Sequence, residues 1–133
     1  MQARAALRTG RVKAFLALLF VLTLDLGTLS SATARESLGQ TINYLLDYMA
    51  NSHATFIRNG ATHTPAQAVD HIKAKYEHFK NEIKTPEDFI RLAASKSLLT
   101  GNPYLVRPPG GAERRLDEWL TEALKAHRVA EQR

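Results

Sequence analysis

The strongest constraint on this chain is the pair Asn59-Gly60, which lies between two short segments suited to β-structure. Residues 55–57 are β-branched or aromatic, as strands prefer, and residues 61–63 follow directly after the pair. A type I′ turn needs positive φ at both central residues, which Asn-Gly accepts best. The pattern predicts a tight hairpin over residues 55–63. Because two short strands alone are only marginally stable, this hairpin needs another strand or a helix to pack against.

Two helix starts follow the hairpin, and each carries a capping signal. A threonine stands at the N-cap, a proline at the first helical position, and a side chain that can return a hydrogen bond three residues after the cap. These residues are Thr64, Pro65 and Gln67 in the first start and Thr85, Pro86 and Asp88 in the second. Apolar side chains at helical spacing follow the first start, and we expect them to be buried: Ala68, Val69, Ile72, Tyr76 and Phe79.

The other elements are predicted from apolar periodicity. Helices are expected over residues 37–52, from residue 65, from residue 86 to about 95, and over about 113–128, with a further strand over residues 104–107. The resulting fold is α+β, in the order α-β-β-α-α-β-α. Its small three-stranded antiparallel sheet, the hairpin plus one strand, is packed with about four helices. We assign structural roles in turns, helix starts and the core to Gly60, Pro65, Pro86, Gly101 and Trp119.

The first 34 residues are typical of a secretory signal peptide. Residues 1–13 contain four basic side chains and no acid, residues 14–24 are apolar, and Ala32-Thr33-Ala34 provides an A-x-A site. An uncleaved membrane anchor is the alternative, but a span needs about 20 apolar residues and Asp25 interrupts the run earlier. We therefore predict cleavage between Ala34 and Arg35, a single domain over residues 35–133, and a periplasmic or secreted location.

Charge and cysteine content exclude several classes of function. The whole chain has a net charge of +5, but residues 1–34 hold four of the 18 basic residues and one of the 13 acidic residues, which leaves 14 and 12. A net charge of +2 with interspersed signs does not predict a nucleic-acid-binding surface. The absence of cysteine excludes thiol catalysis, cysteine-bound metal, lipid attachment through cysteine and disulfide bonds.

A group of basic side chains lies around the hairpin and the helix that follows it. Arg58 and Asn59 lie at the turn, and His71 and Lys75 flank the buried face of the helix on the same side. Tyr104 and Arg107 delimit the other predicted strand, so the sheet could gather all of these residues into a cationic patch for a carboxylate or phosphate. The simpler alternative is that the two arginines pair with acids and that His71 caps a loop carbonyl. The acids concerned are Glu82, Glu87 and Asp88.

Three other readings compete with this patch. A small hydrolase could use Ser95 or Ser97 as nucleophile with His71 or Lys75 as base, but the G-x-S-x-G and S-x-x-K motifs are absent. A metal site is disfavoured because the helical histidines His71 and His78 are about 10 Å apart along the axis and H-E-x-x-H is absent. A protein partner could contact an open sheet edge or four amphipathic aromatic residues. These are Tyr44, Tyr48, Tyr76 and Trp119.

Taken together, these observations favour a non-enzymatic binding or interaction module. The expected partner is a small anionic ligand or another periplasmic protein, with no cofactor, no metal and no nucleic acid. Membrane contact is expected only through the signal peptide before its cleavage. Arg58, Asn59, His71, Lys75, Ser95, Ser97, Tyr104 and Arg107 are the candidate ligand-binding residues.

Residues spread from about 42 to 124 resemble a family of small exported bacterial proteins known only as a domain of unknown function. The resemblance rests on Phe56, Arg58-Asn59-Gly60, Ala66, Ala68, His71, Lys75-Tyr76, Phe89-Ile90, Ala94-Ser95, Ser97, Gly101, Pro103-Tyr104, Val106-Arg107 and Trp119-Leu120. Members often carry a cysteine where this chain has His53-Ala54, and an aromatic residue just after the Asn-Gly pair, where this chain has residues 61–63. The resemblance implies a signal peptide and an exported α+β domain, and it implies no particular activity.

Overall fold

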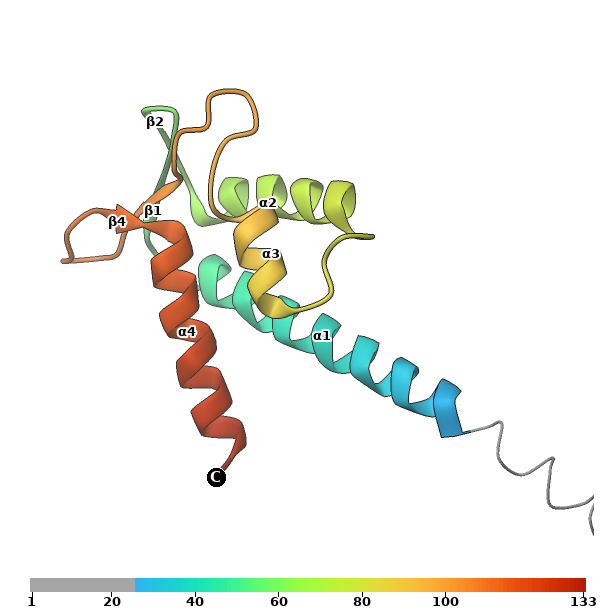
Figure 1. Cartoon of the computed structure of the whole chain (residues 1–133). Coiled ribbons are helices and arrows are strands. Elements are labelled where there is room, and N and C mark those ends of the chain that lie inside the picture. The colour runs from blue at the N-terminus through green and yellow to red at the C-terminus, as the bar shows by residue number, and fades with distance from the viewer. Residues whose placement is uncertain (1–25) are drawn as a thin grey trace, which may run out of the picture. The chain divides into compact units, whose positions relative to one another are not determined.

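Four helices and four strands make up the part of the chain that the structure describes (Figure 1). This computed structural model describes residues 26–133, with side chains from residue 37 onward. The helices are α1 (Leu26–Ala50), α2 (Pro65–Phe79), α3 (Pro86–Ala93) and α4 (Leu116–Glu131). The strands are β1 (Thr55–Arg58), β2 (Ala61–His63), β3 (Leu105–Arg107) and β4 (Arg114–Arg115). Residues 36–133 form one compact unit, and the α+β class predicted from the sequence is confirmed.

The hairpin forms as the Asn-Gly pair predicts. Asn59 and Gly60 have φ angles of 50° and 78°, so both central residues of the turn have the positive φ that a type I′ turn requires. The two-residue turn fixes the register, in which Arg58 lies opposite Ala61 and Phe56 lies opposite His63. Because side chains alternate across a strand, Phe56, Arg58 and His63 share one face of the sheet.

The sheet has four antiparallel strands in the order β2-β1-β3-β4, so the expectation of three strands is wrong. The additional strand β4 lies immediately before α4 and pairs through Leu105↔Arg115 and Val106↔Arg114. Two consecutive arginines carry no strand signal, since they are neither β-branched nor alternating in polarity. Their pairing with β3 decides the conformation instead, and it delays the start of α4 to Leu116 rather than residue 113.

Both predicted capping boxes are present. Thr64 and Gln67 exchange hydrogen bonds at the start of α2, and Thr85 and Asp88 do so at the start of α3. Helix α1, by contrast, begins at Leu26 rather than at residue 37. The prediction started at residue 37 because the apolar stripe that packs on the domain begins only at Leu38.

The predicted leader lies mostly outside the described residues, which exclude residues 1–25. The predicted cleavage site, Ala34-Arg35, falls within the backbone span of α1. Within the described residues, no helix combines the length and apolarity that a membrane crossing requires.

The core lies between the helices and the sheet face that carries Phe56 and Val106, both of which are buried. Trp119 of α4 is buried as predicted and packs against the rings of Phe56 and Tyr48, with centroid distances of 6.0 Å and 4.6 Å. This packing fixes α1 and α4 against the central strand β1. The other end of β1, next to the turn into β2, therefore lies beside α2 and the segment between α3 and β3.

Candidate functional site

A small cleft lies between the β1–β2 hairpin and α2. Its volume is about 20 Å³, which is room for roughly one water-sized group. The alternation of side chains along β1 and its register with β2 place Arg58 and His63, which both line the cleft, on the same face of the sheet. The polar side chains that line it are Arg58, His63, Gln67, His71 and Tyr104. The sequence-predicted residues Arg58, His71 and Tyr104 are thus brought together.

Lys75 lies beside the cleft, one turn further along α2 than His71, and contacts the cleft residue Tyr104. Its side chain is buried, with a relative exposure of 6%. Its Nζ donates hydrogen bonds to the carbonyl oxygen of Lys96 (2.6 Å) and to the hydroxyl of Tyr104 (3.3 Å). The same Nζ lies 4.8 Å from the centre of the Tyr104 ring, within the range of a cation–π contact. Lys75 therefore fixes both the loop that follows α3 and the ring of Tyr104.

Tyr104 links Lys75 to His71. An ammonium group only donates hydrogen bonds, so the oxygen of Tyr104 accepts from Lys75. The hydroxyl proton is then available to His71 Nε2, which lies 2.9 Å from this oxygen. The bonds from Lys75 to Tyr104 and from Tyr104 to His71 can form together when His71 is neutral, because a neutral imidazole offers one nitrogen as acceptor.

The surroundings of the cleft lower the pKa of two basic groups on α2, His71 and Lys75. Burial lowers the pKa of His71 below 6.5, and the positive charges of Arg58, Lys75 and His63 lower it further. Burial, assisted by the charge of Lys96, lowers the pKa of Lys75 from 10.5 to about 8. The neighbouring charges named in these two shifts are all basic, which makes the cleft a place where an anion would relieve repulsion.

Arg58 has no carboxylate within ion-pair distance among the described residues. The simpler alternative, in which Arg58 and Arg107 pair with Glu82, Glu87 or Asp88, is therefore wrong in its details. Arg107 pairs with Glu113 at 2.8 Å, and His71 bonds to Tyr104 rather than to a loop carbonyl. Arg107 thus lies outside the cleft.

Asn59 and Ser97 belong to a different network beside the cleft. The amide of Asn59 donates to Ser97 Oγ (3.3 Å), and its Oδ1 accepts from the hydroxyl of Thr100 (2.7 Å). Ser97 Oγ also accepts from the backbone N–H of Thr100. These bonds connect the β1–β2 turn to the loop between α3 and β3, so both residues position backbone rather than line the cleft.

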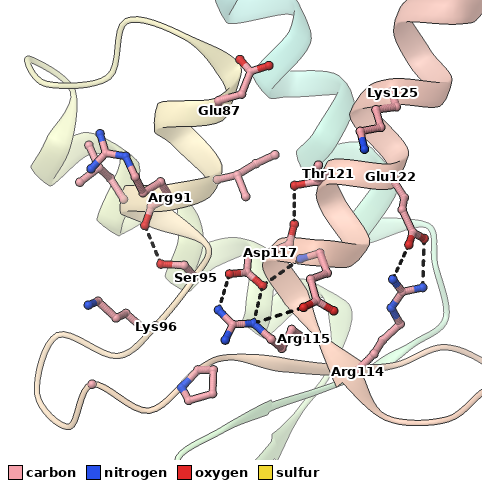
Figure 2. A pocket seen from close by; sticks show the side chains of 15 residues that line it. Glu87, Arg91, Ser95, Lys96, Arg114, Arg115, Asp117, Thr121, Glu122 and Lys125 are labelled. Carbon is pink, nitrogen blue, oxygen red and sulfur yellow. Dashed lines mark hydrogen bonds and ion pairs between the residues drawn. The ribbon is translucent and has the colours of Figure 1, made fainter.

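Ser95 lies on the side of a second and much larger depression. This groove, with a volume of about 1010 Å³, runs between α3 and the start of α4. Figure 2 shows the hydroxyl of Ser95 directed at the carbonyl oxygen of Arg91, to which it donates a hydrogen bond. Within the described residues no hydrogen bond joins Ser95 or Ser97 to His71 or Lys75. The nucleophile–base contact that a hydrolase requires is therefore not formed.

The charges of the groove are largely neutralised within the chain. Arg114 binds Glu122 through two hydrogen bonds of 3.0 and 2.6 Å, and Arg115 binds Asp117 through two bonds of the same lengths (Figure 2). The arginines lower the pKa of Glu122 and Asp117 below their ordinary values. These bidentate pairs neutralise Arg114 and Arg115, whereas Lys96 and Lys125, which also line the groove, form no ion pair among the described residues.

The sequence analysis missed two polar cleft residues as binding candidates, Gln67 and His63. The Nε2 atom of His63 is buried and has no hydrogen-bond partner among the described residues. The Asn-Gly turn could have identified it, because a two-residue loop places His63 opposite Phe56 and hence on the face of Arg58. Within residues 37–133, no three His, Asp or Glu side chains gather as a metal site would require.

The fold and the cleft describe a small α+β domain with an unneutralised cationic site. The chain belongs to a family of unknown function, DUF5329, which matches residues 36–128. This confirms the resemblance seen in the sequence. The chain is similar to an uncharacterized protein of Salmonella typhimurium strain LT2, YfeK, with 42% identity over 64 residues. That alignment covers 47% of this chain and 53% of the relative, so the chain spans about half of the relative's length. No solved structure matches the chain.

Proposed function

We propose that this protein is an exported, non-enzymatic binding module whose cleft holds the anionic end of a ligand. The observation that carries the proposal is that Arg58 and His71 line one cleft with Tyr104, whose hydroxyl is bonded to His71 and Lys75. Among the described residues, these three basic side chains form no ion pair with an acid. Unneutralised cations in a partly desolvated site favour an anion more strongly than the same groups in water.

The size of the cleft indicates how such a ligand would bind. A volume of about 20 Å³ accepts one oxygen-sized group and not a whole metabolite. We therefore expect a terminal carboxylate or phosphate to place an oxygen beside His71, while the rest of the ligand lies over the hairpin. A guanidinium at the edge of the cleft is suited to this task, since Arg58 can contact two oxygens of such a group at once.

The first test is a titration with inorganic phosphate and with acetate, followed by two-dimensional ¹⁵N NMR. Resonances of the hairpin and of the first two turns of α2 should shift together with the ring of His71. Arg58→Gln should weaken phosphate binding roughly tenfold or more, as expected for loss of a charged hydrogen bond.

Arg107→Gln is the matched control, because it removes the same charge from a residue that is paired with Glu113 outside the cleft. Its affinity for phosphate should remain near that of the wild type. Equal losses in the two variants, or shifts scattered over the surface at millimolar phosphate, would show that the anion follows net charge and not the cleft.

Export is supported by the basic start, the apolar run of residues 14–24 and the A-x-A site that ends at Ala34. Expression in a bacterium followed by mass spectrometry of the periplasmic fraction checks this part of the proposal. The expected product begins at Arg35. Recovery of the intact chain in the cytoplasm would contradict it.

A further inference from the structure

The loop between α3 and β3 presents two leucines to solvent. We call residues 97–102 the tip loop. Leu98 and Leu99 have relative exposures of 60% and 95%, and Leu99 is the most exposed large hydrophobic residue among residues 37–133. Figure 1 shows this loop rising beside the β1–β2 turn, away from the helices that form the core. Adjacent leucines at a protruding tip are unlike a scatter of single exposed apolar residues, which needs no explanation.

The backbone of the tip loop is held in place by hydrogen bonds. Ser97 N–H donates to the carbonyl of Asn102 and Gly101 N–H donates to the carbonyl of Ser97, both at 2.9 Å. The hydroxyl of Thr100 donates to Asn59 of the hairpin turn at 2.7 Å. The leucines are therefore presented on an ordered platform, so little conformational freedom is lost when they enter an apolar surrounding.

The two segments that contain the tip loop and the hairpin hold no acidic residue, although Lys96 and Gly101 also border the groove that Asp117 and Glu118 line. The tip loop lies within residues 89–112 and the hairpin within residues 48–69, and neither segment contains Asp or Glu. The same segments contain four basic residues, of which Lys96 immediately precedes the tip loop and Arg58 precedes the turn to which the loop is bonded. Apolar side chains flanked by cations match the two components of an anionic membrane surface, its acyl boundary and its headgroups.

From these observations we propose that the tip loop docks on a bilayer that contains anionic phospholipid, with Leu98 and Leu99 inserted at the headgroup boundary. A protein partner fits less well, because a specific interface covers about 800 Å² on each side and a two-residue tip is far smaller than that. The acyl boundary needs only a small apolar tip, and anionic headgroups would bind the exposed Lys96. This proposal does not depend on ligand binding in the cleft.

The absence of cysteine permits a site-specific test in the full chain. Leu99→Cys is labelled with an environment-sensitive fluorophore and mixed with vesicles of phosphatidylcholine, with or without phosphatidylglycerol. The emission should shift to the blue, and nitroxide-labelled lipids should quench it, only when phosphatidylglycerol is present. Lys96→Gln should weaken this response several-fold, and added salt should reduce it because exposed charges are screened.

Val129→Cys is the matched control, since Val129 is also an exposed apolar residue, with a relative exposure of 54% on the last turns of α4. Its fluorophore should not respond to the vesicles, even when residues 1–25 bind the membrane. An unchanged signal at position 99, or equal responses at positions 99 and 129, would overturn the proposal. So would a blue shift at position 99 that follows protein concentration without vesicles, because the leucines would then bind a second copy of the chain.

Discussion

Two depressions of this domain differ in size and in charge balance, and the basic groups that line the smaller one have no acidic partner among the described residues. The groove between α3 and α4 has a volume of about 1010 Å³, whereas the cleft beside the hairpin has a volume of about 20 Å³. In the groove, Arg114 and Arg115 are bound to carboxylates. In the cleft, Arg58 has no carboxylate partner among the described residues, and the amine of Lys75 binds a carbonyl and a hydroxyl instead.

From this difference we infer that local charge balance, and not volume, decides which of the two surfaces would favour an anion. Exposed ion pairs such as those of the groove contribute little to stability and neutralise the field that a charged ligand would feel. Basic groups without acids do the opposite, since they repel one another until an anion arrives. The predictions below compare matched substitutions in the two places.

The largest difference is expected in stability. Lys75→Ala should lower the free energy of unfolding by about 3 kcal/mol, because it removes a buried stem and leaves the carbonyl of Lys96 without its donor. Arg115→Ala should cost far less, because exposed ion pairs are screened by solvent. Urea denaturation of both variants measures this. Lys75→Met keeps the apolar stem and removes only the amine, so it separates the two contributions. Similar losses in the free energy of unfolding for Lys75→Ala and Arg115→Ala would refute the contrast.

A smaller effect is expected in the pH dependence of stability. The pKa of Lys75 is about 8 in the folded chain, against 10.5 as its ordinary value. Between these values the unfolded chain binds a proton that the folded chain does not, so stability should rise with pH. Comparison at pH 8 and pH 9 stays below the opposite contribution of Tyr104, whose pKa is raised from 10.0. The rise should disappear in Lys75→Met and persist in Arg115→Ala; a rise that survives in Lys75→Met would assign it to other groups.

The smallest effect concerns a single titration. Burial and then the charge of Arg58 lower the pKa of His71, so as pH falls below 6.5 the unfolded chain is protonated first and stability declines. Arg58→Gln should raise the pKa of His71 toward 6.5, whereas Arg115→Gln should leave it unchanged. NMR titration of the imidazole resonances measures both. An identical pKa in wild type and Arg58→Gln would place the guanidinium too far away to act on the cleft.

Local signals in the sequence predict most of the secondary structure. The Asn-Gly turn, the capping boxes at Thr64 and Thr85, and the apolar stripes each depend on residues a few positions apart, so their physics is contained in a short segment. Strand β4 could not be found in this way. Its residues, Arg114 and Arg115, become a strand only because β3 supplies hydrogen-bond partners.

The candidate site was predictable in part, for the same reason. Helical spacing placed His71 and Lys75 together, and the sheet was expected to bring Arg58 and Tyr104 to them. Arg107 was expected there too, but strand alternation places it next to Val106 on the other face, where it meets Glu113. The partners of Ser95 and Ser97 depend on how the chain turns after α3, and no short-range pattern specifies that turn.

The bond between His71 and Tyr104 joins residues 33 positions apart, and the bond between Asn59 and Ser97 joins residues 38 positions apart. Contacts between residues so far apart in the sequence stabilise the chain only after a long loop has closed, and they are associated with slow folding. The β1–β2 hairpin and α2 need no such closure. We therefore expect them to form early, whereas the pairing of β1 with β3 completes the domain. The cleft and the tip loop would then arise in that same last step, so that a chain still folding would offer neither of them to a ligand or to a membrane.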